Sequence, residues 1–141
     1  MTDLEARVAA LEDELALRQL LARFAFLEDT GRDAEWVALW TEDGVYDLDG
    51  TQVVGHAALR ALMPEYRHWM HTHSATLEVR VEGDTAVALG YTVLHQERDG
   101  AIAPISAASN RWTFRRVEGR WLVAGRVRRQ IGTDGFDDAL G

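Results

Sequence analysis

The feature that most constrains the fold is a change in hydrophobic period along the chain. In the first 29 residues, apolar side chains recur at helical spacing, beginning with Leu4, Val8, Leu11 and Leu15. From residue 77 onward, apolar and charged residues alternate, which is typical of half-buried strands. Helices followed by a long run of antiparallel strands indicate an α+β fold. One curved sheet wrapped by the helices would leave a cone-shaped pocket between the two layers.

Start and stop signals place the individual elements. Thr2 and Glu5 form a capping-box pattern, and the helix that they start is expected to run to about Asp29 and to end at Gly31. The pair Asp49-Gly50 predicts a tight hairpin turn between two strands. The remaining elements are expected as helices over about 33–40 and 55–64, and strands over 45–48, 52–54 and, from 71 onward, several that include 104–117 and 120–131.

Composition excludes several classes of protein. A formal net charge of −8 disfavours nucleic acid and anionic membranes as partners. No segment approaches the roughly 20 apolar residues of a membrane span, and the polar N-terminus is unlike a secretory signal, so the expected location is the cytoplasm. The absence of Cys excludes disulfides, Cys-ligated zinc and thiol catalysis. Without a linker or repeat, the chain is expected to form one domain over 1–141, ending in a flexible tail over 132–141.

The candidate chemistry lies in a few polar residues set among apolar ones. Asp29 closes the first helix, His71 and His73 share one strand face, and Asn110 lies in a later apolar strand. If these side chains meet in one pocket, the carboxylate can orient and polarise the imidazole, which then acts as a base. The alternatives are a solvated acid at a helix end, a structural histidine and an asparagine bonded to backbone.

Other chemistries have weaker support. His71 and His73 are spaced as two metal ligands on one strand, but no third acid or histidine has a matching spacing, so no metal is predicted. The sequence contains no Gly-rich phosphate loop and no Ser-centred nucleophile elbow. No organic cofactor is expected, because proton transfer between an imidazole, a carboxylate and a substrate needs none.

Several segments together resemble one known family. They are Asp29–Trp36, Glu42–Tyr46, Glu82–Ala86 and Gly119–Trp121. In order and spacing they are similar to the SnoaL-like branch of the nuclear transport factor 2-like superfamily, and in particular to enzymes of the scytalone dehydratase and bile-acid 7α-dehydratase type. The resemblance covers nearly the whole chain. It implies helices packed on one strongly curved, mostly antiparallel sheet, and a His–Asp pair in an apolar cup that catalyses eliminations without a cofactor, in a homotrimer.

The resemblance also implies roles for individual residues. The aspartate of the family falls on Asp29, its histidine on His71 or His73, with His73 preferred, and its pocket asparagine on Asn110. A similar tail covers the pocket mouth in the family, so Phe136 is expected to close over the cup as a lid; a frayed terminus is the alternative. The residues expected to bind substrate are Tyr46, His71, Tyr91, His95, Asn110, Trp112 and Phe136.

The sequence therefore predicts a cofactor-independent lyase of the dehydratase kind, or an isomerase, acting on a small hydrophobic substrate that is polycyclic or aromatic. His73 would remove a proton from carbon, and Asp29 would stabilise the imidazolium. The alternatives are a non-catalytic module that binds a small hydrophobic ligand, and a polyketide cyclase. A homo-oligomer is expected, a trimer rather than a dimer. Small and apolar residues are expected on the outer face of the sheet, suited to burial against another subunit, namely Ala86, Ala88, Thr113 and Leu122.

Overall fold

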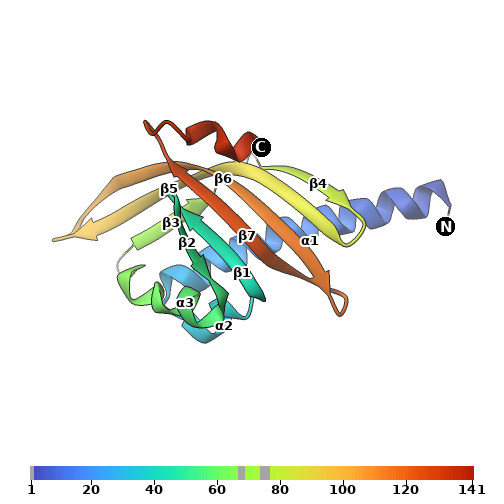
Figure 1. Ribbon diagram of the computed structural model, residues 1–141, viewed down its shortest axis with the longest axis horizontal. Helices are drawn as coiled ribbons and strands as arrows, with labels where there is room; N and C mark the ends of the chain where they lie inside the picture. Colours follow the sequence, from blue (N-terminus) through green and yellow to red (C-terminus); the bar gives the residue numbers. More distant parts are fainter. Residues whose placement is uncertain (1, 67–68, 74–76) are drawn as a thin grey trace.

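The computed structural model describes residues 2–66, 69–73 and 77–141, apart from the side chains of residues 65, 66, 72 and 73. Its centre is a seven-stranded sheet in the order β2-β1-β7-β6-β5-β3, with β4 paired to the other end of β5 (Figure 1). All pairs are antiparallel except β1 with β7. The strands are β1 (Trp40–Leu48), β2 (Thr51–Val54), β3 (Trp69–His73), β4 (Glu78–Glu82), β5 (Thr85–Arg98), β6 (Ala101–Val117) and β7 (Arg120–Gln130).

Helices cover one face of this sheet and a short 3₁₀ helix lies on the other. The helices are α1 (Asp3–Asp29), α2 (Asp33–Val37), α3 (Gly55–Ala61), and the 3₁₀ helices η1 (Met63–Tyr66) and η2 (Phe136–Leu140). Figure 1 shows α1, α2 and α3 below the sheet and η2, in red, above it. The α+β fold expected from the hydrophobic period is confirmed.

The ends of α1 follow from its capping residues. The Thr2 N–H donates to Glu5 Oε2 at 2.7 Å, and the Glu5 N–H donates to Thr2 Oγ1 at 3.1 Å, which completes the predicted capping box. Gly31 reverses the chain after the helix with a φ of +68°, a conformation that glycine adopts without steric cost. The second half of α1 packs toward the sheet, and the residues that it buries are Leu17, Leu21, Phe24, Leu27 and Glu28.

Aromatic rings fill most of the core between the sheet and the helices. The Phe24 ring lies 5.2, 5.7 and 5.0 Å from the rings of Trp36, Trp40 and Trp112, measured between centroids. Trp40 in turn stacks on Tyr46 at 6.1 Å. Tilted and edge-on contacts of this kind stabilise the core beyond the area that they bury. They also leave little room for large side chains from the sheet.

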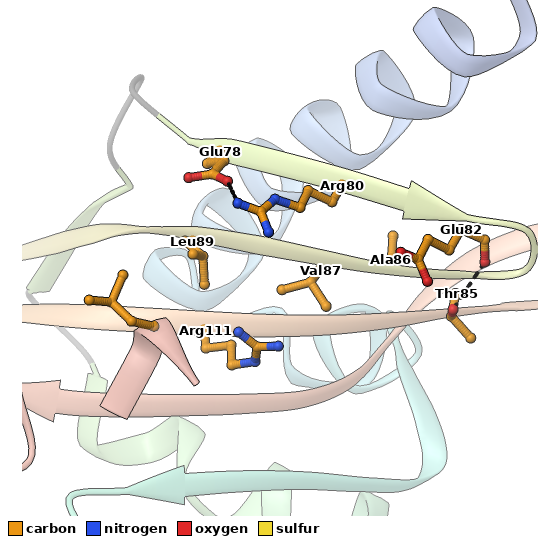
Figure 2. A pocket seen from close by; sticks show the side chains of 9 residues that line it. Glu78, Arg80, Glu82, Thr85, Ala86, Val87, Leu89 and Arg111 are labelled. Carbon is orange, nitrogen blue, oxygen red and sulfur yellow. Dashed lines mark hydrogen bonds and ion pairs between the residues drawn. The ribbon is translucent and has the colours of Figure 1, made fainter. Parts of the chain in front are cut away.

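For this reason the two faces of β5 are the reverse of those expected. The prediction that Ala86 and Ala88 face outward is wrong, because both are buried in the aromatic core, where only small side chains fit. Their larger neighbours Val87 and Leu89 instead line an outer groove of about 400 Å³. Figure 2 shows these two side chains beside Arg111, on the face of the sheet away from the helices.

Some boundaries also differ from the predicted ones. The helix expected over 33–40 ends at Val37, and β1 begins at Trp40 rather than at residue 45. Leu39 O accepts a hydrogen bond from the Val123 N–H at 2.8 Å, so the chain joins the sheet as soon as the helix ends. The Asp49-Gly50 hairpin is confirmed, with positive φ at both residues as a type I′ turn requires. Within the described parts of the chain, no helix is long and apolar enough to cross a membrane.

Candidate active site

Asp29 and His71 form the contact on which the site is built. His71 Nδ1 lies 2.6 Å from Asp29 Oδ1, and the main-chain N–H of His71 donates to both carboxylate oxygens, at 3.0 and 2.9 Å. Asp29 ends α1 and His71 lies at the middle of β3, so the contact joins the helix end to the strand. The two side chains are 16% and 7% exposed. A carboxylate at Nδ1 favours the tautomer that carries its proton there and leaves Nε2 as the basic nitrogen.

Glu28 brings a second carboxyl group to the same imidazole. Its Oε2 lies 3.5 Å from His71 Nδ1, and its side chain is completely buried. Neither carboxyl oxygen has a hydrogen-bond partner within the described structure. Desolvation raises the pKa of Glu28, against smaller opposing effects of His71 and Arg126. Because burial without donors disfavours a carboxylate, Glu28 keeps its proton to a higher pH than a solvated glutamate does.

A buried cation lies across the site from this acid. Arg126 of β7 is 2% exposed, and it donates from Nε to Asn110 Oδ1 at 2.8 Å and from Nη2 to Thr92 Oγ1 at 3.3 Å. Its guanidinium carbon lies 4.3 Å from the ring centroid of Trp112 and 4.8 Å from that of Tyr46, where the ring faces stabilise the charge. Its Nη1 has no hydrogen-bond partner among the described groups. The site therefore holds a buried positive charge in a fixed orientation.

These groups border a cavity of about 320 Å³. His71, Thr92 and Arg126 supply polar atoms, while Trp69 and Leu94 are among its apolar walls. The volume lies within the range of small-molecule sites, and a mostly apolar wall with a few convergent polar groups is the usual composition of such sites. Burial in this region also raises the pKa of the Tyr46 hydroxyl, so that this side chain stays a neutral hydrogen-bonding group.

The structure brings together several of the residues predicted to bind substrate. Tyr46 and His71 line the cavity directly. Asn110 and Trp112 are fully buried behind it, where they hold Arg126 by a hydrogen bond and by ring stacking. The side chain of His73 lies outside the described residues, so its predicted role stays a prediction.

Three further predicted residues lie away from this cavity. Tyr91 is 57% exposed, and its ring stacks on Phe136 with 6.3 Å between centroids. Ser109 Oγ donates to Phe136 O at 2.5 Å, which fixes the tail to the face of the sheet opposite the helices. The prediction that Phe136 covers the cup is therefore wrong, and Tyr91 belongs to the outer face because β5 presents its small residues to the core. His95 follows a strand irregularity after Leu94 and does not line the cavity.

Sequence reasoning missed Arg126, which the pattern of β7 places among surface charges. Thr113 of β6 pairs with Gly125 of β7, and the next residue of β6, Phe114, pairs with Val123. Ala124 has no partner in β6 and is therefore an extra residue in β7. This bulge resets the alternation, and Val123 and Arg126 share the inner face. Gly125, an isolated glycine inside a strand, is the sequence signal that could have indicated the bulge.

Metal binding has little support in this geometry. In the described residues, no group of three or more His, Asp or Glu side chains is arranged to hold a metal ion. The polar groups around the cavity suit hydrogen bonding and proton transfer instead.

Comparison with known proteins shows the family. A family model of the SnoaL-like domain matches residues 9–127. A nuclear transport factor 2-like protein with a cystatin-like fold from Novosphingobium aromaticivorans is 32% identical, with a TM-score of 0.88 and coverage of 100% of this chain and 97% of that chain. A candidate aromatic ring hydroxylase from the same organism is 27% identical, with a TM-score of 0.75 over 87% of this chain and 92% of that chain.

A further similar structure contains a small molecule. It is a protein from Catenulispora acidiphila in complex with S-DNPA, 24% identical, with a TM-score of 0.76 and coverage of 86% of this chain and 94% of that chain. None of the curated proteins matches this chain significantly in sequence. The matched domain spans most of the sequence and the sheet and helices have the arrangement of these relatives, so the chain belongs to the SnoaL-like family.

Proposed function

We propose that the protein is a cofactor-independent enzyme that moves a proton on carbon in a small hydrophobic carbonyl compound, by a dehydratase-like elimination or by isomerisation. The observation that carries the proposal is the 2.6 Å contact between Asp29 and His71 at the wall of a small-molecule cavity. Membership of the SnoaL-like family, whose fold serves cofactor-free enzymes and ligand-binding modules, supports it.

The first step assigns the base to His71. With Nδ1–H donated to Asp29, Nε2 takes the proton from a carbon next to the substrate carbonyl. The imidazolium that forms is stabilised by the Asp29 carboxylate, which is already oriented by the main-chain N–H of His71. The raised pKa of Glu28 favours its protonated form, so this acid adds less negative charge beside the ring than a solvated glutamate would.

The second step assigns the developing negative charge to Arg126. As the C–H bond breaks, its electron pair moves toward the carbonyl oxygen and forms an enolate. A guanidinium held by Asn110 and Thr92 is oriented before the reaction, and its positive charge at the cavity wall stabilises that oxygen. Preorganised donors of this kind can contribute about 3 kcal/mol each to lowering a barrier.

The proton that His71 has taken can then follow either of two routes, and each completes a balanced reaction. In an elimination, the enolate electrons form the new C=C bond as the C–O bond to a neighbouring hydroxyl breaks, and the imidazolium gives its proton to that hydroxyl, so that water leaves. In an isomerisation, the imidazolium returns the proton to another carbon of the enolate. Both outcomes regenerate neutral His71 without any cofactor.

A nitrobenzisoxazole tests for this base without knowledge of the natural substrate. Its ring opens when a base removes the proton on its carbon, and the released phenolate is coloured. We expect His71→Ala to lower the rate by about 100-fold or more, the usual contribution of a positioned base. His95→Ala is the matched control, because His95 lies on the same sheet but does not line the cavity.

The outcomes separate the possible bases. If His71→Ala keeps its rate while His73→Ala loses it, the base is His73, as the sequence alone favours, and the assignment to His71 is wrong. If neither variant changes the rate while both keep the wild-type melting temperature, the proposal of an enzyme fails.

A ligand-binding module is the second candidate function. The similar Catenulispora protein was solved with a bound small molecule, and a cavity of about 320 Å³ suits a ligand whether or not it reacts. This alternative predicts that small hydrophobic ligands bind equally well to the wild type and to His71→Ala, with no turnover of any carbon acid.

A further inference from the structure

The N-terminal half of α1 exposes a row of large apolar side chains. Leu4, Val8, Leu11 and Leu15 are 66, 44, 67 and 56% exposed, although all four belong to a regular helix. We call these four residues the α1 stripe. Single exposed apolar residues are common on protein surfaces, but a continuous row at helical spacing marks an interaction surface.

The stripe points away from the domain to which the helix belongs. Asp13 accepts hydrogen bonds from Arg116 at 2.9 Å and from Trp121 at 3.0 Å, and these are contacts with the end of the β6–β7 hairpin. Leu4 and Asp13 are nine residues apart, and nine residues make about two and a half helical turns, so they lie on opposite sides of α1. Figure 1 shows the first turns of α1 extending past the sheet.

The spacing of the stripe is that of a helix made to pair with another helix. Successive members are separated by four, three and four residues, which places Val8 and Leu15 at a positions and Leu4 and Leu11 at d positions of a heptad. A β-branched residue at a with leucine at d favours two parallel strands. The apolar residues that pack on the sheet belong to the opposite side of the helix.

The charges beside the stripe indicate how two helices would align. In a parallel pair, Arg7 at a g position faces Glu12 of the partner subunit at an e position, and the same attractive contact recurs by symmetry. In an antiparallel pair, Glu5 would instead face Glu12 of the partner subunit, two like charges. The opposite flank would need Glu14, which is paired with Arg18 of its own chain at 2.7 Å. Arg7 is held less closely, since it lies 3.8 Å from Asp3 and both side chains are exposed.

Two heptads are too few for isolated peptides to pair, but α1 is already a helix. The capping box fixes its first turn, and the packing of its second half on the sheet fixes its axis. A surface that is ordered before association loses little conformational entropy on binding. Short isolated helices fail to form because nucleation is unfavourable, but here the folded domain has already formed the helix.

We propose that the α1 stripe is the contact surface for a second copy of this chain, with the two helices parallel and in register. The assembly proposed is therefore a dimer, in place of the trimer that the family resemblance implies. The pairing places like a and d residues opposite each other. It leaves the cavity beside His71 uncovered, because His71 contacts Asp29 at the far end of α1 from the stripe. The inference is independent of the proposed chemistry.

Charge introduced at the centre of the stripe tests this surface. We expect the wild type to sediment as a dimer at micromolar concentration, and Leu11→Glu to weaken the dimer by roughly 30-fold or more, as loss of a central apolar contact does. Ala10→Glu is the matched control, since Ala10 is exposed on the neighbouring face and should leave the dimer intact. The circular dichroism and the melting midpoint of the domain should be unchanged in both variants.

Cysteine pairing tests the alignment, and the chain contains no other cysteine. In a parallel pair, Leu11→Cys meets its own copy and forms a disulfide on mild oxidation, whereas Ala10→Cys does not. Crosslinking only in a mixture of Val8→Cys and Leu11→Cys would show an antiparallel pair and overturn the alignment. A monomeric wild type at high micromolar concentration, or a dimer that Leu11→Glu leaves intact, would overturn the surface itself.

Discussion

Two carboxyl groups lie beside one imidazole, and their surroundings are different. Asp29 is partly exposed and accepts hydrogen bonds from the main chain and ring of His71. Glu28, one residue earlier, is completely buried without a hydrogen-bond partner among the described groups, and its pKa is raised. Because α1 ends here, two successive residues point to different surroundings. Asp29 is thus available to support an imidazolium, while burial favours the protonated form of Glu28.

Asp29→Asn tests the support of the imidazolium. The amide can still accept a hydrogen bond from His71, but it has no negative charge to stabilise the protonated ring. We expect the rate on a nitrobenzisoxazole to fall on the order of 100-fold while the circular dichroism spectrum is retained. Asp33→Asn is the control, because Asp33 is an exposed acid that pairs with Arg60 near the same helix end. Equal rates for both variants would remove Asp29 from the mechanism.

Glu28→Gln tests the buried acid through stability. Burial raises the pKa of Glu28 above its unfolded value of 4.5, so the folded state holds the proton more tightly. The contribution of this group to stability is complete below that pH and is lost as the pH rises through the folded-state pKa. Glutamine does not ionise, so the variant should become progressively more stable than the wild type as the pH rises from 4.5 toward the folded-state pKa. The gain in the free energy of unfolding should be about 1.4 kcal/mol per pH unit across that window.

Urea unfolding over a series of pH values measures this difference. Glu42→Gln, a change at an exposed glutamate, serves as the control and should show a nearly constant difference from the wild type. A Glu28→Gln curve parallel to that of the wild type would contradict the raised pKa.

At the scale of elements, the sequence predicts where the strands lie better than it predicts which residues of each strand face the core. In β6 the alternation holds without interruption near the site, so spacing alone was enough to place Asn110 and Trp112 on the core face. In β7 the extra residue Ala124 resets the alternation and turns Arg126 inward. A bulge depends on pairing with the neighbouring strand, and pairing is not encoded in the local pattern of one strand.

The reversed faces of β5 and the environment of Glu28 have a different cause. Large apolar residues are usually assigned to the core, but the rings contributed by α1, α2 and β1 already fill it, and this is known only after the helices are packed. Likewise, an acid at a helix end is usually solvated, and Glu28 is buried only because α1 docks beside β3 and β7. The Asp29–His71 contact was accessible to sequence reasoning through the family resemblance.

Truncation after Gly132 tests the role of the tail. The tail lies on the outer face, where Ala139 is buried and Phe136 stacks on Tyr91, so its removal should leave turnover unchanged. Loss of these apolar contacts should lower stability by roughly 2 kcal/mol, about the value of one buried side chain. Thermal melts and rates on a nitrobenzisoxazole measure the two effects. A large rise in KM at an unchanged melting temperature would instead support the predicted role of Phe136 as a lid over the cavity.

At the scale of the whole molecule, charge is distributed unequally between surface and cavity. The chain carries a net charge of −8, whereas the cavity contains the buried cation Arg126. A negative exterior slows the approach of anions. The arrangement therefore suits a neutral substrate whose oxygen becomes negative only during the reaction.

Ligand-induced stabilisation tests this preference. We expect a bicyclic aromatic ketone to raise the melting temperature, since a ligand at 100 times its Kd contributes about 2.7 kcal/mol. The analogue with a methylene group in place of the carbonyl should bind more weakly, because it has no oxygen to interact with the Arg126 guanidinium. Arg126→Met should remove the difference between the two compounds. Stronger binding of the corresponding carboxylate than of the ketone would contradict the proposed substrate class.

The contact between the end of α1 and β3 also affects how the protein folds. Asp29 and His71 are 42 residues apart, and their hydrogen bonds exist only when the end of the first helix has docked on the strand. A chain with native secondary structure but an undocked α1 has no catalytic pair. Closing a loop of this length costs conformational entropy, so the contact forms only together with the tertiary packing that offsets this cost. Recovery of turnover after dilution from denaturant therefore reports a single tertiary docking step, and a partly folded population contributes nothing to it.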